Sequence, residues 1–116
     1  MPTIMNTRAN NDPLVQIQKT YETIRDNFSR LIRVASTDEE RNQIRDWYSN
    51  ANDAFWFASN HILNDLNDRV INLTAELSVS NNKLQTDLRD IQNLAQTLED
   101  IKQVVLLAAS IAALAV

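Results

Sequence analysis

The sequence has no glycine and no cysteine, and both of its prolines lie within the first thirteen residues. Tight β-hairpin turns favour glycine, and no run of this chain alternates apolar with polar residues, so the sequence predicts no β-sheet. The absence of cysteine excludes disulfides and thiolate metal sites, and it is typical of a reducing compartment. These absences predict an all-α protein.

Basic residues are also outnumbered. The chain carries 11 Lys and Arg against 15 Asp and Glu, a net charge of −4, which argues against nucleic acid as a partner. Residues 1–12 are polar and lack the apolar stretch of a signal peptide, so we expect a flexible N-terminus on a cytoplasmic protein. Residues 13–116 are enough for a single helical domain, and an apolar content of 44% for the whole chain supports a core.

The first helix is predicted over residues 13–35. Asp12 can cap the helix and Pro13 suits its first position. Apolar residues then recur at alternating spacings of three and four, which is a heptad pattern. The next helix should begin near residue 38, because Thr37 with Glu40, or Ser36 with Glu39, can form a capping box.

Residues 38–116 contain no proline or glycine and follow an almost continuous helical pattern. The polar cluster at residues 78–82 is read here as a turn, since serine and asparagine compete with helical hydrogen bonds. We therefore expect helices at 38–77 and 82–115, folded into an antiparallel coiled-coil hairpin that completes a three-helix bundle. The alternative is one continuous helix from about 38 to 116. Size matching favours the hairpin, because it sets four rings opposite residues 103–113, which are rich in alanine. The rings are those of Trp47, Phe55, Trp56 and Phe57.

No catalytic, cofactor or metal site is predicted. The only histidine, His61, has no glutamate three residues before it and no cysteine with which to pair. Acidic residues lie at helix-surface spacings from bases, as in Asp65 with Arg69 and Lys83 with Asp87. No glycine-rich loop is present to hold a phosphate. We expect a protein that is not an enzyme.

The strongest functional signal is the apolar segment at residues 104–116, in which Ser110 is the only polar side chain and seven residues are Val, Leu or Ile. Leaving these seven in water would forgo on the order of 10–20 kcal/mol, so something must cover them. They can be covered by the core, by another subunit, or by a membrane. A helix of this length rises only about 20 Å, which is too short to span a bilayer alone.

The surface expected to contact a partner combines this segment with Trp56 and Phe57. These two rings follow Phe55 directly, and three consecutive side chains on a helix cannot all face the same neighbour. The residues of this surface are Trp56, Phe57, Val104, Leu107, Ala108, Ile111, Ala112 and Ala115. We expect a non-enzymatic helical-bundle interaction or assembly module, whose partner is a second copy or another helical protein. The alternative is a membrane-interacting or α-helical pore-forming component that uses residues 104–116.

Overall fold

The computed structural model describes residues 12–116, which are 81% helix and contain no strand. Four helices follow one another: α2 (Pro13–Val34), α3 (Asp38–Ser59), α4 (Asp68–Arg89) and α5 (Leu94–Ala112). The all-α class is confirmed, whereas the three-helix count and the continuous helix from 38 to 116 are both wrong. The predicted flexible N-terminus lies, except for Asp12, outside the described residues.

Helix α2 begins and ends where the sequence predicts, to within one residue. The Asp12 carboxylate accepts a hydrogen bond of 2.9 Å from the Leu14 amide and one of 3.3 Å from the Val15 amide, and Pro13 occupies the first helical position. The helix ends because Ala35 adopts an extended conformation. Its apolar stripe faces the core, with Ile17, Ile24 and Leu31 fully buried and Leu14 and Phe28 partly buried.

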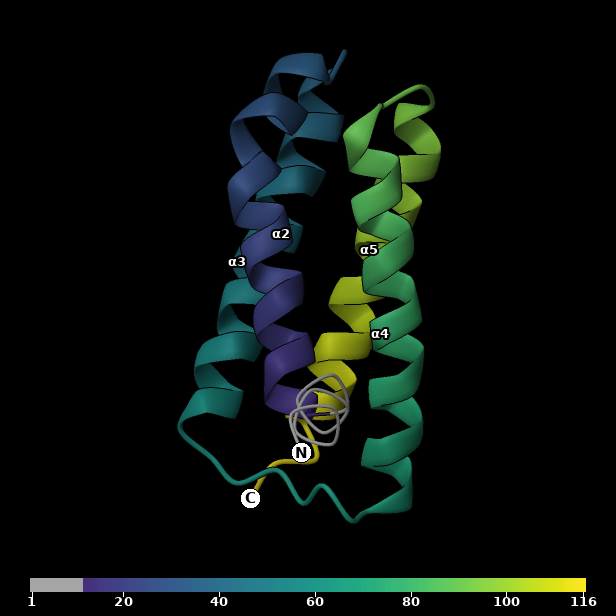
Figure 1. Cartoon of the computed structure of the whole chain (residues 1–116). Helices are drawn as coiled ribbons and strands as arrows, with labels where there is room; N and C mark the ends of the chain where they lie inside the picture. Colours follow the sequence, from purple (N-terminus) through teal and green to yellow (C-terminus); the bar gives the residue numbers. More distant parts are fainter. Residues whose placement is uncertain (1–11) are drawn as a thin grey trace.

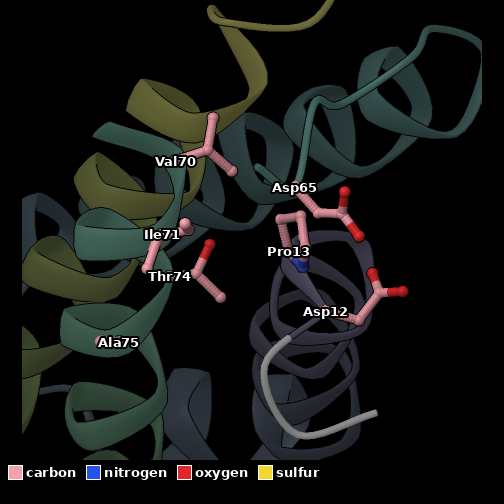
Figure 2. A pocket seen from close by; sticks show the side chains of 7 residues that line it. All are labelled: Asp12, Pro13, Asp65, Val70, Ile71, Thr74 and Ala75. Atoms are coloured by element: carbon pink, nitrogen blue, oxygen red, sulfur yellow. The ribbon is translucent and has the colours of Figure 1, made fainter. Parts of the chain in front are cut away.

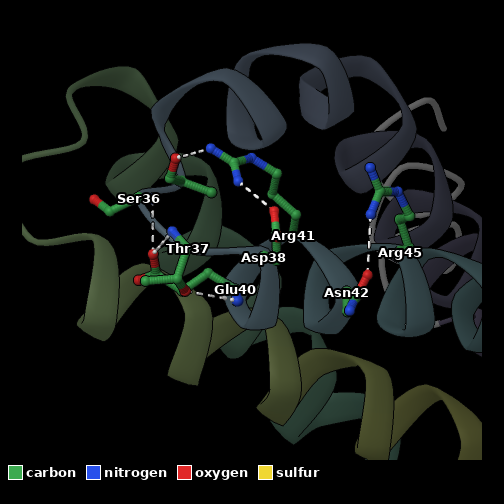
Figure 3. Close-up of polar contacts among 8 residues, drawn as sticks. Ser36, Thr37, Asp38, Glu40, Arg41, Asn42 and Arg45 are labelled. Atoms are coloured by element: carbon green, nitrogen blue, oxygen red, sulfur yellow. Dashed lines mark hydrogen bonds and ion pairs between the residues drawn. The ribbon is translucent and has the colours of Figure 1, made fainter.

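Helix α3 begins at the predicted capping box (Figure 3). The Thr37 hydroxyl accepts a hydrogen bond from the Glu40 amide, and the Glu40 carboxylate accepts one from the Thr37 amide, both at 3.1 Å. Arg41 ties the turn down, donating to the Ala35 carbonyl at 3.0 Å and to Asp38 at 2.9 Å. The predicted continuation to residue 77 is wrong, because α3 ends at Ser59 and residues 60–67 form a loop.

Helix α4 runs through residues 78–82, so the turn predicted there is wrong. Asn81, in the middle of that polar cluster, is buried against α2. Its side-chain amide donates to the Gln16 backbone carbonyl at 3.1 Å and accepts from the Thr20 hydroxyl at 2.9 Å. Partners on a neighbouring helix therefore satisfy the side chain that was expected to break the helix.

The chain instead turns back at residues 90–93, between α4 and α5. Asn93 caps α5 by accepting a hydrogen bond of 3.1 Å from the Gln96 amide, and the helix ends at Ala112 rather than at residue 115. No residue of the described chain has a positive φ, so all three connections are made without a left-handed backbone conformation.

The four helices form a bundle of two antiparallel hairpins, α2 with α3 and α4 with α5 (Figure 1). The loop of residues 60–67 crosses the lower end of the bundle in this view, so that α3 and α5 lie side by side and point the same way, as do α2 and α4. Helix α5 packs against all three others. Its buried side chains, together with Ile17, Ile24, Leu31, Leu77 and Leu84 from α2 and α4, form the centre of the core.

Candidate interaction surface

Exposed apolar side chains gather at one end of the bundle, where α2 and α4 begin and α3 and α5 end. Of the ten exposed large hydrophobic residues in the described chain, seven lie at this end or in the loop that closes it. They are Val15, Trp56, Phe57, Ile62, Leu66, Ile71 and Val116. The loop is fixed to the last residue of the sequence, since the backbone groups of Ile62 and Val116 exchange hydrogen bonds of 2.8 and 2.9 Å.

Trp56 and Phe57 both reach solvent from the last turn of α3. Trp56 is 56% exposed and donates its indole N–H to Asn52, one turn earlier, at 2.9 Å. Phe57 is 44% exposed and stacks on the imidazole of His61, with ring centroids 3.9 Å apart. The His61 Nδ1 lies 2.7 Å from the Phe57 carbonyl oxygen, so this histidine serves as an exposed cap on the end of α3.

A groove of about 420 Å³ lies between α3 and α5 on the outside of the bundle. Phe57 forms part of its wall, and Leu106, which is 54% exposed, projects from the facing helix. The remaining lining is small and mostly apolar. The groove residues are Asn50, Asp53, Ala54, Phe57, Val105, Leu106, Ala109, Ala112 and Ala113. A shallow apolar channel with a projecting leucine can accept side chains from another helix.

Most of the predicted surface from α5 faces inward. Val104, Leu107, Ala108, Ile111 and Ala112 are buried in the core of the same chain, and only Ala112 also lines the groove. Ala115 is half-buried beyond the end of the helix. The bundle itself therefore covers much of the apolar segment at residues 104–116.

The rings do not all lie against the alanine-rich segment as predicted. Because α3 and α5 are parallel, Trp47 lines a second groove with Leu98, near the start of α5. Of the four rings, Phe57 is the one that lines the α3–α5 groove together with Ala112. Phe55 stacks on Tyr21 of α2 at a centroid distance of 5.3 Å. Phe57 is the ring that lies against the small residues of α5.

Acidic residues dominate the charges at the apolar end. Asp12, Asp65 and Asp68 are exposed there, and Arg69 is the basic residue among them. The described residues contain no ion pair between Asp65 and Arg69, although their spacing on a helix predicted one; Asp65 lies in the loop instead. The local charge disfavours contact with an anionic surface.

One polar cluster differs from the pairing of Lys83 with Asp87 that the sequence predicts. Lys83 forms an ion pair with Asp100 of α5 at 3.4 Å, rather than with Asp87 on its own helix. Asp100 is only 8% exposed and also accepts a hydrogen bond of 3.1 Å from Gln96. A hydrogen bond with Asp100, reinforced by burial, raises the pKa of Asp87 to about 6, while Lys83 lowers it. Asp100, across the α4–α5 hairpin, therefore favours the protonated form of Asp87.

Two further structural findings concern chemistry and membranes. Within residues 12–116, no group of three or more His, Cys, Asp or Glu side chains is placed to hold a metal ion. No helix in that part of the chain combines the length and the apolar character needed to cross a bilayer.

Comparison of the chain with models of known families, with curated proteins and with solved structures finds no match. The function proposed below therefore rests on the fold and its surfaces.

Proposed function

We propose that this protein is a non-enzymatic helical-bundle module that assembles with a second copy of itself through the face shared by α3 and α5. The observation that carries the proposal is the α3–α5 groove, into which the exposed Leu106 of another copy can insert. Ala109 and Ala113 beside Leu106 are exposed and small, so the two α5 helices can approach closely.

Two-fold symmetry makes this surface self-complementary. In a dimer with one two-fold axis, the same patch on both copies meets, so each Leu106 would enter the groove of its partner. Phe57 then supplies the large aromatic contact that interfaces commonly contain near their centre. The bundle measures 45 × 29 × 19 Å, and its broad side is large enough for the roughly 800 Å² that a standard interface buries on each partner.

Light scattering during size-exclusion chromatography tests the proposal. We expect the wild-type chain to run at about twice the 13.2 kDa of one chain. Leu106→Glu places a charge in the middle of the contact and should give monomers with unchanged helix content. The matched control is Val34→Glu, which changes a residue of similar exposure on α2, at the opposite end of the bundle, and should leave the dimer intact.

A wild-type chain that stays monomeric at hundreds of micromolar would refute self-assembly. A Leu106→Glu variant that still dimerises would refute the α3–α5 face as the contact. The alternative, membrane binding through residues 104–116, requires α5 to leave the core in which five of the predicted contact residues are buried. Vesicle flotation tests it in the same samples. Binding to neutral vesicles with a blue shift of tryptophan emission, and no dimer, would favour the membrane function instead.

A further inference from the structure

The charges on the α3–α5 face are mostly of one sign. A second groove, of about 320 Å³, continues the α3–α5 groove towards the start of α5, and Glu40, Glu99 and Lys102 are its charged residues. Asp53 is the charged residue of the first groove. Three carboxylates against one ammonium group give the lining of the two grooves a net charge of −2.

These charges are not neutralised inside the bundle. None of the four side chains forms an ion pair within the described part of the chain. The Glu40 carboxylate accepts a hydrogen bond of 3.1 Å from the Thr37 amide, which is a neutral donor and leaves the carboxylate charged. Asp53, Glu99 and Lys102 are exposed. A partner that covers this face therefore meets a negative surface.

A two-fold dimer brings two copies of this negative surface together, because the same patch meets itself. Each Lys102 can neutralise only one carboxylate at the contact, so two carboxylates on each copy keep an uncompensated charge. Salt screens exposed charges over a length of about 30 Å at 0.01 M and about 8 Å at 0.15 M. The repulsion between the two copies should therefore be strong in dilute salt and weak at physiological ionic strength.

We infer that ionic strength regulates assembly through the α3–α5 face, so that added salt tightens the dimer. This regulation rests on the self-assembly proposed above and names what controls it. Two faces of charge −2, about 10 Å apart in water, predict a dissociation constant about three- to tenfold lower in about 0.15 M than in about 0.01 M salt. Association with a partner of opposite charge would weaken with salt instead.

Sedimentation equilibrium of the full chain in about 0.01 and 0.15 M NaCl measures the dissociation constant in both conditions. Asp53→Asn combined with Glu99→Gln leaves one carboxylate against one ammonium group, and both positions are exposed. This double variant should dimerise about three- to tenfold more tightly than the wild type in dilute salt and respond little to added salt. Lys102→Gln leaves three carboxylates unopposed, so its dimer should be weaker than that of the wild type and respond more steeply.

The matched control removes the same amount of charge away from this face. It combines Asp65→Asn with Glu76→Gln. Asp65 lies in the loop beside Pro13, with its carboxylate pointing away from Thr74 (Figure 2), and Glu76 is an exposed residue of α4. Neither acid lines either groove of the α3–α5 face. We expect this control to keep the salt response of the wild type, with the helix content unchanged by circular dichroism in every variant.

A wild-type dissociation constant that stays the same or rises with salt would overturn regulation by ionic strength and leave self-assembly standing. Regulation by this face is also wrong if Asp53→Asn with Glu99→Gln responds to salt as the wild type does, or if the control loses the response as fully. Wild type and both double variants that stay monomeric in every salt concentration would refute self-assembly itself, and its regulation with it.

Discussion

Replacing Asp87 by asparagine should stabilise the bundle at pH 7 and flatten part of its pH dependence. The pKa of Asp87 rises from an ordinary 3.8 to about 6 in the folded chain, chiefly through its hydrogen bond with Asp100. Between these two values the native state holds more protons than the unfolded state. The free energy of unfolding contributed by Asp87 therefore falls as the pH rises through this window.

The size of the effect follows from the shift. A difference of roughly two pKa units, at about 1.4 kcal/mol each, sets a ceiling of about 3 kcal/mol. Asp87 is only partly buried, so solvent screens the interaction and we expect about 1–2 kcal/mol. The amide introduced by Asp87→Asn can donate to Asp100 at every pH, as the protonated acid does only below about 6.

The assay is urea unfolding of wild type and variant at intervals from pH 4.5 to 7.5, followed by circular dichroism. The difference between the two unfolding free energies cancels the titration of the other carboxylates. We expect it to grow in favour of Asp87→Asn as the pH rises and to level off above pH 7. Asp46→Asn, at an exposed position on α3, should show no such trend. Parallel curves for wild type and Asp87→Asn would refute the raised pKa of Asp87.

Three other substitutions test the packing and the caps. Ala112→Asp places an unpaired charge at a buried position, so the variant should no longer show the cooperative thermal unfolding transition of the wild type. An unchanged melting curve would show that this end of the bundle is not core. Asn81→Leu removes the hydrogen bonds to Gln16 and Thr20 and should cost about 1–3 kcal/mol in urea unfolding, whereas a stabilised variant would contradict the role given to this cluster. Thr37→Ala should cost about 1 kcal/mol while Thr37→Ser costs little, and equal losses would mean that the capping box is unimportant.

The elements that could be predicted are those whose start signals involve only neighbouring residues. Asp12 with Pro13 and Thr37 with Glu40 are local arrangements, and α2 and the start of α3 follow them. The end of α3 was missed because the chain has neither glycine nor proline there. Asn67 caps α4 and Asn93 caps α5, and the sequence analysis used neither, although asparagine is a favoured N-cap residue.

The turn placed at residues 78–82 was wrong for a reason that no local pattern contains. Asn81 is tolerated inside α4 because Gln16 and Thr20, about sixty residues earlier, provide its hydrogen bonds. The same limit applies to the surfaces. The outward position of Trp56 could be predicted from adjacent rings on one helix. The α3–α5 groove could not, because it depends on which helices of the bundle lie side by side.

The absence of left-handed backbone has a consequence for how this chain tolerates sequence change. Three connections are made with no positive φ between residues 12 and 116, so no described position requires the conformational freedom of glycine. Alanine therefore meets no backbone penalty wherever it replaces a non-proline residue in this region. An alanine scan of residues 12–116 would therefore report on packing, capping and surface chemistry, with no position at which the loss of a glycine conformation confuses the result.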